Sequence, residues 1–335
     1  AASSSPATSA APGPPTTSSP PSGTTMLDAL NPDRIFQKHS WLLTRDLAIV
    51  TSPDFDGLLC ALLGAAHLDW RLVGFYDGQT LALATPVAHI RELVFLDVEI
   101  YRPAVRSLGN HLLQWDKHLP TPGFAQTLNP NLLRSITCRE FDRKYPFGTF
   151  HFMLALLLAG RINISLPAVT SHLVSIFLYP DGTHQNTLKY RTNAQDWVTW
   201  LGVKTQATAA AFFHQLTGVP LADLVHALGW LDQELQSIGF AKKDDPCRFN
   251  PTQAVDYARA SRLWAFLQRH TGWTSAPLPT PSVVIKLDNR STKLTRTNYL
   301  NVLTQNPLSL ALTSRSHAQG LQYTLVPPNW RWLTD

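Results

Sequence analysis

The chain has 335 residues, of which 44% are hydrophobic and 15% charged, and its formal net charge is +5. It is therefore long enough for two domains with a substantial core. Its three cysteines, Cys60, Cys138 and Cys247, are widely spaced and odd in number, which argues against a disulfide framework or a zinc knuckle. No apolar run reaches the roughly 18 to 20 residues of a membrane span, so we expect no membrane contact and a reducing compartment such as the cytoplasm.

Residues 1–25 contain no charged residue and consist almost entirely of Ala, Ser, Pro, Thr and Gly. Such a segment cannot bury enough apolar surface to fold. We expect a disordered tail or linker here, and Met26 is a candidate natural start.

Residues 26–190 alternate between apolar strands and helical segments, as in a parallel α/β domain. Strands are expected at residues 47–52, 70–78 and 93–100, with a helix at 57–68 after the first strand. Helical patterns follow at 147–160 and 166–178. The predicted fold class is therefore α/β, with a parallel sheet and flanking helices.

Residues 191–273 predict a helical connector, and residues 274–335 a small strand-rich module. Helical spacing marks residues 207–218, 221–240 and 251–273, and strands are expected at 282–289, 308–314 and 320–326. The last 95 residues are basic, with twelve Lys and Arg against five Asp. This charge suits a phosphate-bearing partner such as single-stranded nucleic acid or a nucleotide, although a solvated surface explains it equally well.

Acidic residues follow the predicted strands. Asp54 and Asp56 come after the first strand in SPDFDG, Asp97 ends VFLD, and a later YPDGT contains Asp181. The carboxyl ends of parallel strands meet at one edge of a sheet, where ligands bind, and carboxylates suit hard divalent cations. The structural alternatives are helix caps at Asp54 and Asp56 and a plain Asp-Gly turn at Asp181.

The order of these motifs resembles the DHH phosphoesterases, which include RecJ-type nucleases, oligoribonucleases and manganese-dependent pyrophosphatases. SPDFD is similar to the first motif of that family, VFLD with Asp97 to the second, and YPDGT to the fourth. The third motif, the DHH triplet, is matched by Gly109, Asn110 and His111. Together these matches extend over about 130 residues.

The resemblance implies a site with two divalent cations, Mg²⁺ or Mn²⁺. Asp97 would bridge the two ions, Asp54 would bind one ion, and Asp56 and Asp181 the other. His111 would contact the substrate phosphate, beside Asn110. The catalytic set implied is therefore Asp54, Asp56, Asp97 and His111.

The chain also departs from the family pattern. Val50 stands where the family has a metal-binding His, Asn110 replaces the middle His of the triplet, and the Gly-Gly-His motif of the substrate-binding domain is absent. Only oxygen ligands would then remain, which favours Mg²⁺. Lys293 and Arg296 lie roughly where the family places substrate-binding residues, and they are expected to bind the substrate.

Two functions are compatible with these residues. The first is a divergent metal-dependent phosphoesterase that acts on a nucleic acid, an oligonucleotide or a nucleotide phosphodiester. The second is a DHH-like pseudoenzyme that has lost catalysis and binds a nucleotide, a nucleic acid or a protein partner.

Overall fold

The computed structural model describes residues 29–160, 162–202, 207–240, 247–315 and 318–333. The predicted tail, residues 1–25, lies outside these ranges. Within them, no helix is long and apolar enough to cross a membrane.

A seven-stranded sheet forms the centre of the molecule, with the strand order β6-β5-β4-β1-β2-β3-β7. Its strands are β1 Ala48–Thr51, β2 Arg71–Tyr76, β3 Thr80–Leu83, β4 Leu93–Leu96, β5 Arg106–Leu108, β6 Thr127–Leu128 and β7 Val283–Lys286. Strands β6, β5, β4, β1 and β2 are parallel, and β3 runs antiparallel to both of its neighbours. The predicted α/β class with a mostly parallel sheet is therefore confirmed, and β3, β5 and β6 are strands that we did not expect.

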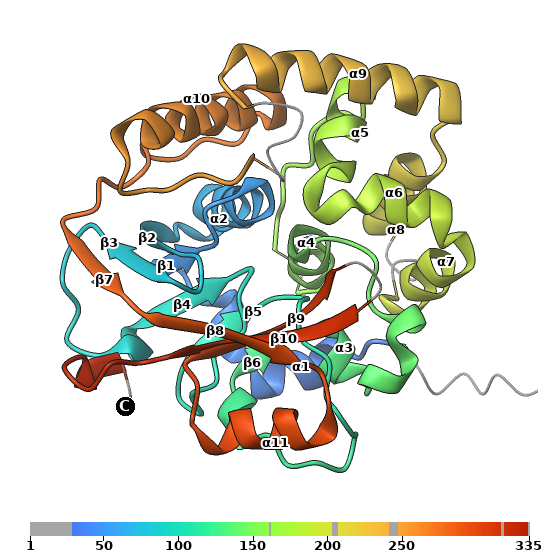
Figure 1. The fold of residues 1–335 in the computed structure, drawn as a ribbon. Coiled ribbons are helices and arrows are strands. Elements are labelled where there is room, and N and C mark those ends of the chain that lie inside the picture. The colour runs from blue at the N-terminus through green and yellow to red at the C-terminus, as the bar shows by residue number, and fades with distance from the viewer. Residues whose placement is uncertain (1–28, 161, 203–206, 241–246, 316–317, 334–335) are drawn as a thin grey trace, which may run out of the picture.

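Helices surround this sheet and extend to one side of it (Figure 1). The α-helices are α1 Pro32–Lys38, α2 Phe55–Leu68, α3 Pro130–Leu133, α4 Thr149–Ala159, α5 Ser171–Leu178, α6 Thr183–Lys189, α7 Arg191–Trp200, α8 Ala207–Thr217, α9 Leu221–Ser237, α10 Ala254–Thr271 and α11 Arg296–Thr304. The short 3-10 helices are η1 Ser40–Leu43, η2 Ile90–Glu92, η3 Pro122–Phe124, η4 Cys138–Arg143, η5 Pro180–Gly182 and η8 Arg331–Leu333.

Helix α2 begins directly after β1 and is almost completely buried. Asp54 is its N-cap, and the Asp54 carboxylate accepts a hydrogen bond from the backbone N–H of Gly57. A Cβ at Gly57 would lie 2.3 Å from the carbonyl oxygen of Ser52, so only glycine allows the helix to start this close to the strand. Local sequence therefore places the first acidic motif at the carboxyl end of β1.

The helices expected from residues 207, 221 and 251 onward correspond to α8, α9 and α10. Helix α9 packs along α5, and α10 contacts both α2 and α5. Figure 1 shows α9 and α10 on the side of the molecule opposite to α11. The helical connector is therefore packed against the α/β core.

The C-terminal segment forms a second, antiparallel sheet of β8 Asp288–Lys293, β10 Ala318–Leu325 and β9 Ser309–Arg315, in that order. The strands expected at 282–289, 308–314 and 320–326 correspond to β7, β9 and β10, and β8 was not expected. Because β7 joins the main sheet, residues 274–335 share the central sheet of the α/β domain. Helix α11 was not expected. It begins at Thr295, whose hydroxyl accepts the N–H of Asn298.

Backbone hydrogen bonds join the second sheet to the loops that follow β4 and β5. Tyr101 donates to the carbonyl oxygen of Leu308, and Leu312 donates to that of His111. The buried guanidinium of Arg102 donates to backbone carbonyls on both sides of this contact, including those of Tyr101 and Pro307. The second sheet therefore lies directly against the carboxyl edge of the main sheet.

Candidate metal centre

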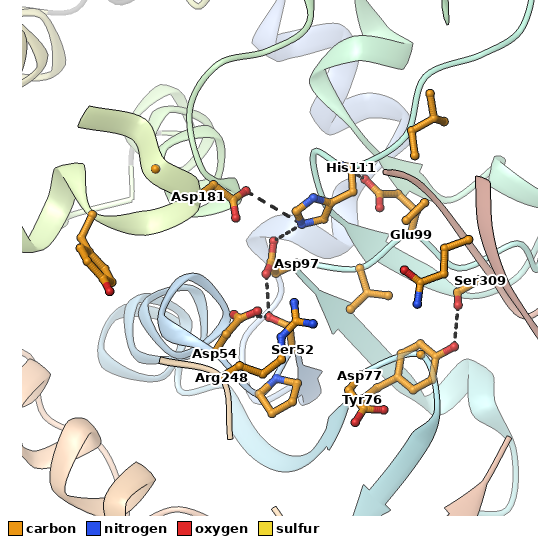
Figure 2. Close-up of a pocket in the computed structure, with 18 of the residues that line it drawn as sticks. Ser52, Asp54, Tyr76, Asp77, Asp97, Glu99, His111, Asp181, Arg248 and Ser309 are labelled. Carbon is orange, nitrogen blue, oxygen red and sulfur yellow. Dashed lines mark hydrogen bonds and ion pairs between the residues drawn. The ribbon is translucent and has the colours of Figure 1, made fainter. Parts of the chain in front are cut away.

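Four chain segments meet at the carboxyl edge of the parallel strands. Ser52 and Asp54 follow β1, Asp97 follows β4, His111 follows β5, and Asp181 lies in the turn between α5 and α6. All five residues line one pocket of about 1150 Å³ (Figure 2). The predicted meeting of these strand ends is therefore present in the structure.

Asp97 lies at the centre of the group. One of its carboxylate oxygens accepts a hydrogen bond from Ser52 Oγ at 2.6 Å; the other accepts one from Thr149 Oγ1 at 2.6 Å and lies 3.0 Å from His111 Nε2. Asp97 also has a left-handed backbone with φ of 61°, which is uncommon for a residue with a side chain. Such backbones occur preferentially at functional sites.

Asp97, His111 and Asp181 each direct one ligand atom toward the same point. These three atoms lie within 4.8 Å of one another, with His111 Nε2 4.0 Å from an Asp181 carboxylate oxygen. Two carboxylates and one imidazole form a donor set that suits a divalent transition ion. The residues therefore fit a bound cation.

Asn110 holds Asp181 in place. Its side-chain amide donates to the Asp181 carboxylate at 2.9 Å and to the carbonyl oxygen of Phe147 at 2.7 Å. Asn110 is 2% exposed and does not line the pocket. The structure thus places this residue behind Asp181, away from the surface where a substrate would lie.

Asp56 has a different position from the one that the family resemblance implies. Its two carboxylate oxygens accept the backbone N–H groups of Thr149 at 2.6 Å and Phe150 at 2.9 Å, at the start of α4. Asp56 is 2% exposed, does not line the pocket and lies outside the group of three ligand atoms. It therefore acts as a helix cap supplied from a distant part of the chain, and its expected role as a metal ligand stays a prediction.

Asp54 and Asp97 are joined through a single hydroxyl group. Ser52 Oγ lies 2.7 Å from an Asp54 oxygen and 2.6 Å from an Asp97 oxygen. A hydroxyl has one proton to donate, so it satisfies only one carboxylate unless the other is protonated. Burial and the negative charge of Asp97 raise the pKa of Asp54 to about 7, which makes Asp54 the partner that can carry this proton.

The remaining pKa shifts follow from the crowding of acids around one imidazole. Burial acts to lower the pKa of His111, but the charges of Asp181 and Asp97 outweigh it and raise this pKa to about 10. Burial acts to raise the pKa of Asp97, yet charge and hydrogen bonds from His111, with further hydrogen bonds from Ser52 and Thr149, hold it below its ordinary value. His111 is therefore a protonated partner of the acids in the cation-free protein.

Cation binding at this group should depend on pH, because His111 must lose its proton to bind a cation. Below a His111 pKa of about 10, each bound cation releases one proton, so the affinity should rise by up to about tenfold per pH unit. Calorimetric titrations with Mn²⁺ between about pH 6 and about pH 8, in buffers of different ionisation enthalpy, measure both effects. An affinity that stays constant over this range would show that His111 is not a ligand.

Glu99 supports the loop that carries His111. One Glu99 oxygen accepts the backbone N–H of His111 at 2.8 Å and the Asn129 amide at 2.6 Å. The other oxygen is buried and has no hydrogen-bond partner among the residues that the structure describes, and burial raises the pKa of Glu99. Gly109 provides the space for this carboxylate, since a Cβ there would lie 2.6 Å from it.

The second sheet and the helical region form the other walls of the pocket. The second sheet contributes residues from β8, β9 and β10, and the helical side contributes Tyr179, His184 and one face of α9. Lys293 and Arg296 are exposed on β8 and α11 and do not line the pocket. The structure therefore does not bring these two predicted substrate-binding residues to the acidic group.

Val50, at the position of the family's metal-binding His, is fully buried in the cluster that contains Tyr76 and Phe95. The preceding residue, Ile49, packs with α2 in the other core cluster. Because side chains alternate along a strand, Val50 points away from the α2 face. It adds no donor to the acidic group.

Three contributors to the site had no recognisable signal in the sequence. Thr149 and Glu99 are ordinary polar residues whose partners lie far away in the chain, and Arg248 lies inside the predicted helical connector, between α9 and α10. Only the fold brings them to the carboxyl edge.

Comparison of this chain with protein-family models, with curated proteins and with solved structures finds no match.

Proposed function

We propose that this protein is a divergent, DHH-like metal-dependent phosphoesterase that cleaves a phosphodiester of a nucleic acid, an oligonucleotide or a nucleotide. The observation that carries the proposal is the convergence of Asp97, His111 and Asp181 on one point of a large pocket. An acidic pocket repels a phosphate unless a cation lies between them. The same three residues can hold that cation.

The donor set favours Mn²⁺ more than the sequence suggested. An oxygen-only set would prefer Mg²⁺, but His111 lies among the ligand atoms and adds an imidazole nitrogen. A bound divalent cation would supply charge neutralisation at the phosphate and lower the pKa of a water molecule.

Asp54 is the residue best placed to accept a proton during hydrolysis. It lines the pocket, and its pKa of about 7 lies near neutral pH, where a general base works most efficiently. Ser52 and the N–H of Gly57 hold one oxygen of its carboxylate. In this proposal the ionised Asp54 carboxylate takes a proton from water as the water oxygen forms its bond to phosphorus. The ester oxygen leaves with the electron pair of the broken phosphorus–oxygen bond and takes up a proton from Asp54 or from solvent.

A calorimetric titration with Mn²⁺ tests the metal centre. We expect one cation per chain, because only Asp97, His111 and Asp181 have ligand atoms close to one another, while the Asp56 oxygens accept the N–H groups at the start of α4. Two cations per chain would instead show that Asp56 leaves its cap to bind metal. The absence of both Mn²⁺ and Mg²⁺ binding would overturn the proposed function.

Hydrolysis of bis(4-nitrophenyl) phosphate and of a labelled single-stranded oligonucleotide, in the presence of Mn²⁺, tests catalysis. The second candidate, a pseudoenzyme that binds its ligand without cleaving it, is favoured by the position of Asp56 and by the orientation of Val50. It predicts cation binding without turnover of either substrate. Lys293 and Arg296 would contribute only to a ligand that extends beyond the pocket.

A further inference from the structure

A short segment between α9 and α10 lies against the start of α2. Phe249 donates its backbone N–H to the carbonyl oxygen of Pro53 at 3.0 Å, and its ring packs edge-on against Phe75. Cys247 is 1% exposed, and Phe249 is 3% exposed. Arg248 is thus held between two buried residues, at a fixed place beside the acidic motif.

The side chain of Arg248 lines the same pocket as Ser52 and Asp54 (Figure 2). Among the lining residues that the structure describes, Arg248 is the only lysine or arginine, whereas six carboxylates line the pocket: Asp54, Asp77, Asp97, Glu99, Asp181 and Asp232. The positive charge of Arg248 acts to lower the pKa of Asp54. An arginine is therefore placed where the pocket is otherwise acidic.

No hydrogen bond or ion pair joins the Arg248 guanidinium to another residue in the described part of the chain. Asp54, whose pKa the charge of Arg248 lowers, is already hydrogen-bonded to Ser52 and to the N–H of Gly57. Within the described residues, the guanidinium donors are therefore available to a ligand. A planar guanidinium binds two oxygens of a phosphate with parallel hydrogen bonds, a geometry that an ammonium group cannot reproduce.

We propose that Arg248 is the phosphate-binding residue of this pocket, on the Asp54 side of the cation group. The inference rests on the proposed function, because the cation at Asp97, His111 and Asp181 would hold the phosphate from the other side. Arg248 would bind non-bridging oxygens of a phosphate ester or of free phosphate. It acts on the ligand and has no part in holding the cation.

The test is a calorimetric titration of inorganic phosphate into the Mn²⁺-loaded protein, with the parent chain, Arg248→Ala and Arg248→Lys. Loss of charge-assisted hydrogen bonds should weaken phosphate binding by about ten- to a hundredfold in Arg248→Ala. Arg248→Lys keeps the charge but cannot form the bidentate hydrogen bonds, so its phosphate affinity should lie between those of the parent and Arg248→Ala. Mn²⁺ affinity should stay equal or become tighter in Arg248→Ala, because a positive charge has been removed from the pocket.

Arg34→Ala is the matched control, since Arg34 is an exposed arginine of α1 that does not line the pocket. It should leave phosphate and Mn²⁺ binding unchanged. Two results would overturn the role of Arg248 and leave the metal centre in place, provided that the parent takes up Mn²⁺. In the first, Arg248→Ala binds phosphate as tightly as the parent does. In the second, the parent itself binds no phosphate. If the parent takes up neither Mn²⁺ nor phosphate, both proposals are overturned.

Discussion

Replacing Asp97 with Asn should weaken Mn²⁺ binding by roughly a hundredfold or more. Asp97 contacts Ser52, Thr149 and His111 directly, so it contributes both a ligand oxygen and the charge that orients the imidazole. Substitution of residues that hydrogen-bond to metal ligands typically lowers metal affinity by about 10- to 100-fold. Removal of a charged ligand should lower it at least as much. Calorimetry with Mn²⁺ measures the loss. Because Asp97 raises the pKa of His111, a nuclear magnetic resonance titration should also show this pKa falling in Asp97→Asn.

Asp33→Asn provides the control for this experiment. Asp33 lies in the first turn of α1, is exposed, and does not line the pocket. The substitution makes the same chemical change without touching the acidic group, so Mn²⁺ affinity should not move. Normal Mn²⁺ binding by Asp97→Asn would place the cation elsewhere and remove the basis of the proposed function.

Replacing Asp56 with Ala should lower the free energy of unfolding by about 2 to 4 kcal/mol, since it leaves two buried N–H groups at the start of α4 without acceptors. Burial and the charges of the neighbouring acids raise the pKa of Asp56. The substitution removes this repulsion, which offsets part of the stability lost with the two hydrogen bonds. Asp56→Asn keeps one carbonyl oxygen and should lose about 1 kcal/mol. Urea unfolding without divalent cations measures both changes.

The two aspartates of the SPDFD motif should therefore respond differently. Asp56→Asn should bind one Mn²⁺ per chain with nearly the affinity of the parent, because Asp56 lies outside the ligand group. If Asp56→Asn unfolds like the parent yet loses Mn²⁺, Asp56 is a ligand, and the two-ion arrangement of the DHH family applies.

Most of the fold could be predicted because buried parallel strands are continuous apolar runs and the helices have clear apolar spacing. The prediction missed the strands β3, β5, β6 and β8 and, among the helices, α1, α3, α6 and α11. Thr80–Leu83 is too short to be told from a connecting stretch, and α11 is a short helix in a polar segment between two strands. The position of β7 in the main sheet depends on pairing with β3, a contact between residues about 200 positions apart.

The candidate site could be predicted in part. Asp54 and Asp97 lie at the carboxyl ends of predicted parallel strands, which must share one edge of the sheet. His111 was selected by the family resemblance, and the strand that it follows, β5, was not predicted. The roles of Asp56 and Asn110 could not be predicted, because each depends on a partner from α4 or from the α5–α6 turn. A resemblance in motif order does not show which carboxylate oxygens accept hydrogen bonds from a helix that lies far away in the sequence.

The sequence by itself determined the α/β class and the acidic strand ends, because both depend on local patterns of hydrophobicity and on residues next to strands. Only the tertiary structure decided which acids share a point, that Asp56 caps α4, and that Arg248 faces the pocket. Hydrogen bonds and charges act over a few ångströms in space. The residues that supply them here are separated by up to about two hundred positions in the chain, and folding alone brings them together.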